Sequence, residues 1–272
     1  MSYLVATAWI KDEAPYLKEW IDFHRLQGFE KFYFYDNNST DNTKEVLAPY
    51  VEKGIAEHRF YPSDVTTRKN FWVMRTTIDE FKGKHKWLFH HSIDEYMFCP
   101  DGRKISDLLT EFEDYSGVVV PWKLFNSSGH ITKEPGYVIE RFTEYIEDSN
   151  NHIKTIIQPD KTIDSVGNPH VYYFSTGFAV DENKEIHDTT NPHSGAMRPG
   201  RPYTRNKILN HHYVCMSRDE YDTKMNKGLL DISMENQRRR EAEAQWNALH
   251  DSNTPKYTST DLLKYVNILK GM

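Results

Sequence analysis

Short apolar runs alternate with amphipathic stretches through the first hundred residues. Bulky apolar side chains without helical spacing indicate strands, which we predict over residues 3–9, 31–35, 55–61 and 87–91. Helical spacing between these runs predicts helices over residues 15–27, 42–51 and 70–81. Strands that alternate with helices in this way form right-handed βαβ units, so the pattern predicts an α/β fold with a parallel sheet.

Three polar clusters follow predicted strands. They are Lys11 to Glu13, the octet 36–43, and the pair Asp94–Glu95. Ligands bind beyond the carboxyl ends of parallel strands, and all three clusters are expected at that edge of the sheet. For the octet, the alternative is an Asx-rich turn that only caps the next helix, with Asn42 as the cap.

The acidic pair Asp94–Glu95 has aromatic and apolar residues on both sides. Most Asp-Glu pairs lie in solvated turns, but these neighbours favour burial. A buried carboxylate pair is costly unless a cation sits against it. The pair therefore predicts either a divalent metal or a positively charged partner.

Composition excludes several classes of protein. The 272 residues carry a net charge of −6, which argues against a general nucleic-acid binder. Two cysteines are too few for a disulfide framework or a thiolate zinc site. The N-terminal sequence is not that of a signal peptide, and no apolar run reaches the roughly 20 residues that span a bilayer. These features predict a soluble cytoplasmic protein.

Five segments together resemble glycosyltransferase family 92 and the bacterial family 2-like GT-A enzymes related to it. The resemblance runs from about residue 3 to residue 228, and the segments that carry it are residues 10–20, 35–42, 87–96, 122–130 and 211–221. The resemblance implies a GT-A fold, with a mixed, mainly parallel sheet flanked by helices and followed by C-terminal helices. We expect a single domain over 1–272, with a nucleotide-binding half at 1–100, an acceptor and metal-completing half at 101–230, and helices at 231–272.

The resemblance also implies an activity. Family members transfer a sugar from a nucleotide-sugar, here a UDP-hexose with UDP-galactose as the suggested example, to a glycan or lipid-linked acceptor. Inversion and metal assistance are implied, with surface polysaccharide or lipopolysaccharide assembly as the setting. The alternatives are a catalytically silent nucleotide- or sugar-binding protein on the same fold, and a nucleotidyltransferase. The latter normally needs a glycine-rich basic loop that Lys11 to Glu13 does not provide.

The metal motif departs from the family pattern at one position. Ser92 stands where the first aspartate of Asp-x-Asp is expected, and Asp94 matches the second. Asp94 is the predicted ligand of Mn²⁺ or Mg²⁺, and His212 matches the family histidine that completes the site. His211 and His212 would face opposite sides of a strand, so only one can reach the metal. Because of Ser92, transfer without a metal stays open.

The donor and the acceptor proton need further residues. Predicted nucleotide-binding residues are Lys11, Glu13, Asp36, Asn38, Arg75, Ser92 and Lys154, although Arg75 equally suits a solvated helix face. An inverting enzyme needs a general base, which stays unassigned among the candidates Glu95, Asp188, Asp231 and Glu235.

The remaining expectations concern the acceptor side. Trp122, Phe125 and the 127–129 loop should border the acceptor, and the aperiodic segment 187–205 is predicted to be a mobile loop that closes over the donor. A surface insertion is the alternative for that segment. The arginine triplet 238–240 suits a solvated helix face, or peripheral contact with anionic lipid if the acceptor is lipid-linked. The oligomeric state is not predicted.

Overall fold

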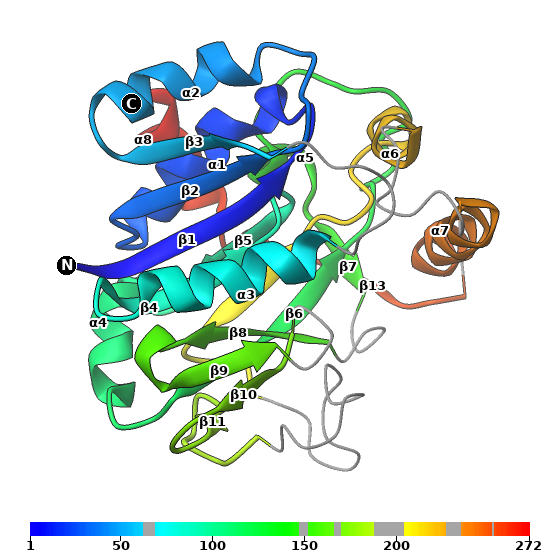
Figure 1. The fold of residues 1–272 in the computed structure, drawn as a ribbon. Coiled ribbons are helices and arrows are strands. Elements are labelled where there is room, and N and C mark those ends of the chain that lie inside the picture. The colour runs from blue at the N-terminus through cyan, green and yellow to red at the C-terminus, as the bar shows by residue number, and fades with distance from the viewer. Residues whose placement is uncertain (62–68, 147–151, 166–169, 188–203, 227–234, 252) are drawn as a thin grey trace.

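The computed structural model describes residues 1–61, 69–146, 152–165, 170–187, 204–226, 235–251 and 253–272 (Figure 1). Its first third is the predicted βαβ series. The strands are β1 (Ser2–Ile10), β2 (Lys31–Asp36), β3 (Ala56–Phe60) and β4 (His85–His91), and the helices between them are α1 (Ala14–Leu26), α2 (Thr43–Glu52) and α3 (Lys69–Phe81). β1 pairs in parallel with β2 and β4, and β2 pairs in parallel with β3. The predicted parallel sheet is confirmed.

Antiparallel strands extend this sheet beyond β4. The strand order is β13-β7-β6-β8-β4-β1-β2-β3. The added strands are β6 (Gly117–Phe125), β7 (Glu144–Ile146), β8 (Ile153–Ile157) and β13 (Lys256–Thr258). β8 pairs antiparallel with both β4 and β6, and so joins the two parts of the molecule. The mixed, mainly parallel sheet implied by the GT-A resemblance is the observed architecture.

Shorter elements complete the second part. β12 (Leu209–His212) pairs in parallel with β6 and antiparallel with β5 (Glu95–Phe98). β9 (Thr162–Ser165) and β10 (Tyr172–Phe174) form a hairpin, and β11 (Ala179–Val180) pairs with β6. The remaining helices are α4 (Ile105–Leu109), the 3₁₀ turns η1 (Thr110–Phe112) and η2 (Pro159–Lys161), α5 (Val138–Arg141), α6 (Arg218–Asn226), α7 (Glu235–His250) and α8 (Leu263–Lys270).

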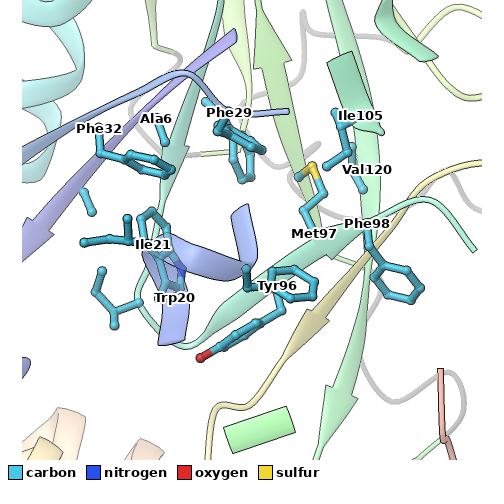
Figure 2. Close-up of a cluster of buried hydrophobic side chains, with 14 of the residues drawn as sticks. Ala6, Trp20, Ile21, Phe29, Phe32, Tyr96, Met97, Phe98, Ile105 and Val120 are labelled. Atoms are coloured by element: carbon cyan, nitrogen blue, oxygen red, sulfur yellow. The ribbon is translucent and has the colours of Figure 1, made fainter. Parts of the chain in front are cut away.

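Both faces of the parallel sheet are covered by helices. Along β1, Leu4 and Ala6 belong to a core shared with α1, α2 and α8, whereas Val5 belongs to a second core shared with α3. Figure 2 shows Trp20 and Ile21 of α1 in the first core, close to Ala6. Burial on both faces explains why β1 is almost continuously apolar.

The ends of α1 follow local chemistry. Pro15 lies in its first turn, where a missing N–H costs no helical hydrogen bond. Gly28 follows it with φ of +93°, and a Cβ there would lie 2.1 Å from Ser106 Oγ. Glycine is thus required at this position by both backbone conformation and space.

The start of α2 differs in detail from the prediction. Asn42 is the N-cap residue, but its side chain makes no capping hydrogen bond. Instead, the Thr43 N–H donates to Asp41 Oδ1 at 3.0 Å. Among the helices of the described residues, none is long and apolar enough to cross a membrane.

Candidate functional site

A cavity of about 590 Å³ opens where the parallel strands end. Figure 1 shows β1 running from the N-terminus towards the side of the molecule on which α6 lies. One wall comes from the loops after β1, β2 and β4, with Trp9, Ile10, Lys11, Glu13, Asn37, Ser92, Ile93 and Asp94. The other wall includes Trp122, His152, His170, His212, Glu220, Thr223, Lys224 and Gln245. Its position is the usual ligand crevice of an open α/β sheet, and its size suits a small molecule.

The first two loops are held together by aspartates. Asp12 Oδ1 accepts hydrogen bonds from the N–H groups of Thr40 at 2.6 Å and Asp41 at 3.2 Å. Asp41 Oδ2 accepts from the Ala14 N–H at 3.0 Å. These reciprocal contacts fix the two loops to each other, so this wall is preformed.

Most side chains of the octet 36–43 do not line the cavity, and several make hydrogen bonds that hold their own loop. Asp36 Oδ1 accepts from the Ser39 N–H at 2.8 Å, and Asp36 Oδ2 lies 2.7 Å from His58 Nε2. Asn38 is exposed, with φ of +57°. Asp36 and Asn38, both predicted to bind the nucleotide, do not line this cavity, whereas Asn37 does.

Asp94 lies at the centre of the cavity wall and is 7% exposed. Its Oδ2 contacts the Lys224 ammonium and lies 3.2 Å from His212 Nε2. Burial raises the pKa of Asp94, but the charges of Lys224 and His212 outweigh it and hold the pKa well below its usual value. The Tyr213 N–H donates to the Asp94 carbonyl at 2.8 Å and so fixes the loop to the end of β12.

Glu95 points away from the cavity and is fully buried. Its Oε2 lies 3.2 Å from His91 Nδ1 and 3.7 Å from Lys154 Nζ, and it accepts from the Ser92 N–H at 3.2 Å. Burial raises the pKa of Glu95, but the nearby Lys154 charge and the His91 hydrogen bond lower it to about 2. Glu95, a candidate base from the sequence, therefore lies outside the cavity in an internal ion pair.

Asp94 and His212 have the chemistry of a divalent-cation site. Their facing atoms are 3.2 Å apart, close to the spacing of two adjacent ligands about 2.1 Å from one ion. Mg²⁺ is typically held by one or two protein groups together with substrate phosphates. In the described part of the chain no group of three or more His, Cys, Asp or Glu residues could hold a metal, so substrate or water oxygens would complete the shell. The two residues fit a cation, but the Lys224 ammonium occupies the same Asp94 oxygen.

The neighbouring histidines of β12 have separate environments. His212 borders the cavity and lies against Trp122, with 4.3 Å between the ring centroids. His211 packs against Phe98 and Phe125 in the interior. Of this pair, His212 is therefore the one that can reach a ligand in the cavity.

An aromatic surface forms the far wall. The Trp122 ring stacks on His152 at 5.5 Å and meets His170 edge-on at 5.2 Å. His170 Nδ1 lies 2.7 Å from the Ile153 carbonyl, a contact that requires the proton on Nδ1. Burial lowers the pKa of His170 to about 3, so its ring is neutral at neutral pH.

The remaining residues that we expected at the acceptor lie elsewhere. Phe125 is buried in the main core and does not line the cavity. Ser128 Oγ accepts hydrogen bonds from the Thr143 and Glu144 N–H groups, both at 2.9 Å, so it fastens the turn to β7. Trp122 alone of the predicted acceptor residues borders the cavity.

Two further predicted nucleotide residues, besides Asp36 and Asn38, do not line this cavity. The Arg75 side chain is 70% exposed and lies 3.5 Å from Asp164, as on a solvated helix face. Lys154 lines a smaller cavity of about 130 Å³, which shares Trp9 and Ser92 with the larger one.

Three candidate bases cannot be placed. Asp188 and Asp231 lie outside the described residues, as does most of the predicted closing loop, residues 188–203. Glu235 begins α7, but its side chain is also outside the described set.

Lys224 was missed from the sequence, although a signal for it exists. It follows Glu220 by four residues on α6, and residues so spaced share one helix face. Glu220 is anchored by Arg141, whose two terminal nitrogens each donate to it at 2.8 Å. That anchor fixes the helix face that brings Lys224 into the cavity.

The chain is similar in sequence to known glycosyltransferases. A family model, Glycosyltransferase family 92, matches residues 5–229. The galactan beta-1,4-galactosyltransferase GALS2 of Arabidopsis thaliana is 27% identical over 109 residues, which cover 37% of this chain and 21% of that protein. A glycosyltransferase family 92 protein of Ricinus communis is 23% identical over 174 residues, covering 58% of this chain and 28% of that protein. The chain thus spans less than a third of these curated relatives, which are plant proteins rather than bacterial ones.

A solved structure also resembles the chain. TarS residues 1–349 from S. aureus is 10% identical with a TM-score of 0.42, and the match covers 92% of this chain and 73% of that 1–349 chain. The sequence comparison is the stronger of the two, because the family model matches most of the chain. The chain belongs to glycosyltransferase family 92.

Proposed function

We propose that this protein transfers a hexose from a nucleotide-sugar to a glycan or lipid-linked acceptor. The observation that carries the proposal is the Asp94–His212 pair, set in a cavity at the carboxyl ends of parallel strands in a family 92 chain. A UDP-hexose is the proposed donor. UDP-galactose is the first to test, since one relative is named a galactosyltransferase.

The chain's residues suit the departure of a nucleoside diphosphate. When the glycosidic bond breaks, negative charge develops on the diphosphate and must be stabilised. Asp94 and His212 would hold Mn²⁺ or Mg²⁺, and a bound ion there would supply Lewis-acid stabilisation. Lys11, Glu13, Asn37 and Ser92 line the wall on which we place the nucleotide.

The acceptor is proposed to bind on the opposite wall. Trp122, His152 and His170 form an aromatic surface on this wall, against which a sugar ring would pack. Inversion requires a base that takes the acceptor proton, and we leave this base unassigned. Surface polysaccharide or lipopolysaccharide assembly, with cytoplasmic location and peripheral membrane contact, is the proposed setting.

A second candidate function rests on Ser92 and Lys224. Ser92 supplies no carboxylate, and Lys224 contacts one oxygen of the carboxylate that is left, Asp94 Oδ2. A protein that binds nucleotide-sugars without transferring them would have such a site. Turnover distinguishes this candidate from the first.

Calorimetry and a release assay test the proposal. We expect UDP to bind and Mn²⁺ to strengthen that binding. UDP-galactose and a panel of glycan acceptors should then yield free UDP. Asp94→Ala should remove the strengthening by Mn²⁺, because the ion loses its carboxylate. Failure of wild-type protein to bind UDP with or without Mn²⁺ would sink the proposal, whereas binding without turnover would favour the second candidate.

A further inference from the structure

The Lys224 ammonium contacts Asp94 Oδ2, an oxygen that a divalent cation would use as a ligand. The same atom lies 3.2 Å from His212 Nε2. The Lys224 side chain is 36% exposed and borders the cavity, so its charge faces the space in which a ligand would bind. One carboxylate oxygen cannot hold the ammonium and an ion in the same place.

The helix that carries Lys224 is firmly anchored. Glu220, one turn earlier, receives two hydrogen bonds from Arg141 and one from the Ser217 hydroxyl at 2.6 Å. The Tyr16 hydroxyl donates to the same carboxylate at 3.0 Å, which ties α6 to α1. The backbone at Lys224 is therefore fixed, whereas its four-carbon stem lets the ammonium move.

A diphosphate would compete with Asp94 for this ammonium. Two negatively charged groups near one lysine repel each other, so Asp94 opposes diphosphate binding unless a divalent ion also neutralises the carboxylate. A divalent ion on Asp94 Oδ2 would displace the ammonium, and Lys224 already lines the cavity. When no ion binds, the lysine is still the cation that lies nearest to Asp94 in the described site.

We propose that Lys224 is a phosphate-binding residue of the donor site, held on Asp94 in the empty protein and transferred to the diphosphate when the donor binds. This inference rests on the proposed function. It makes Lys224 a resident cation that binds the diphosphate with or without a divalent ion. The site then needs Mn²⁺ less than a site with carboxylates alone.

The test compares UDP with uridine by calorimetry in EDTA. In wild-type protein UDP should bind more tightly than uridine. Lys224→Met should reduce the affinity for UDP by about tenfold or more, the usual order for a lost charge-assisted hydrogen bond, and leave uridine binding unchanged. Lys224→Arg should retain most of the affinity for UDP. Lys82→Met, which removes an exposed lysine paired with Asp79, is the matched control and should change nothing.

The variant Asp94→Asn should change the affinity for UDP in the opposite direction. In EDTA this variant should bind UDP severalfold more tightly than wild type, because the lysine is free and the repelling carboxylate is gone. The gain should be smaller when Lys224→Met is also present. With Mn²⁺ the same Asp94→Asn change should weaken UDP binding, since the ion loses a ligand.

The possible results of these binding measurements distinguish failure of the inference from failure of the proposed function. Equal UDP affinity of wild type and Lys224→Met in EDTA would overturn the inference, as would equal losses of UDP and uridine binding. UDP binding by wild type only with Mn²⁺ would also overturn it while leaving the proposed function intact. Absence of UDP and uridine binding in every condition would instead remove the proposed function.

Discussion

Two adjacent carboxylates in this protein have opposite surroundings. Asp94 faces the cavity with Lys224 and His212, whereas Glu95 is buried with Lys154 and His91. Each carboxylate thus has its own ammonium, and one ion pair lines the cavity while the other lies inside the protein. Adjacent residues thus place one carboxylate at the cavity and the other in the interior.

At this scale we predict that Lys154→Met is strongly destabilising. Removing the ammonium leaves Glu95 charged and fully buried, which typically costs about 3–5 kcal/mol. Urea unfolding at pH 7 measures the loss. The double variant Glu95→Gln with Lys154→Met should recover much of it, because no buried charge then lacks a partner. A single variant as stable as Lys82→Met would contradict the structural role of the pair.

The sequence indicates that the acidic pair needs positive charge but not which residues supply it. Lys224 lies 130 positions after Asp94 along the chain and reaches it only because α6 packs at the cavity. Asp36 shows the opposite case, in which a predicted ligand contact is absent. Its place at a strand end suggested a ligand contact, yet Ser39 and His58 already occupy both its oxygens. Local pattern locates polar residues at the functional edge but does not reveal which of them are already paired.

At the scale of elements, a buried carboxylate joins α1 to α5. Glu19 of α1 accepts hydrogen bonds from the Val138 N–H at 2.8 Å and the Ile139 N–H at 3.1 Å, in the first turn of α5. Burial raises the pKa of Glu19 to about 7, although these two hydrogen bonds lower it in part. Arg141 of the same short helix then anchors α6, so Glu19 supports the elements that position Lys224.

This raised pKa predicts a pH-dependent stability. The folded protein binds the Glu19 proton more tightly than the unfolded chain, whose ordinary pKa is 4.5. The contribution is fully present below pH 4.5 and is lost as the pH rises through about 7, by roughly 3 kcal/mol in total. Urea unfolding between pH 5 and 8 should show a smaller decline for Glu19→Gln than for wild type. Parallel curves for the two proteins would refute the assignment.

Elements differ in how well the pattern predicts them. The strands and helices up to β4 lie within two residues of their predicted ends, because their periodicities and their Pro and Gly signals are local. The antiparallel extension through β8, β6 and β7 was not predicted in detail. Its pairings join segments far apart in sequence, and β7 and β8, with three and five residues, carry little periodicity.

At the scale of the whole molecule, the cavity is made by two parts of the chain that meet at β4 and β8. The loops after β1, β2 and β4 form one wall, and β6, β12 and α6 contribute to the other. A ligand that contacts both walls binds only the folded protein, so it should stabilise the whole structure against unfolding.

We therefore predict that UDP with Mn²⁺ raises the melting temperature. At a free UDP concentration 100 times Kd the gain is about 2.7 kcal/mol, which for a chain of this size corresponds to roughly 5 °C. Thermal scans with UDP, uridine and neither ligand measure it. Uridine should give a smaller shift at equal concentration, because it lacks the phosphates that we propose to contact Lys224. In Asp94→Ala, Mn²⁺ should add nothing to the shift caused by UDP alone. Equal shifts for UDP and uridine in wild type would show that the phosphates do not reach the second wall, and the donor would then have to lie in another orientation.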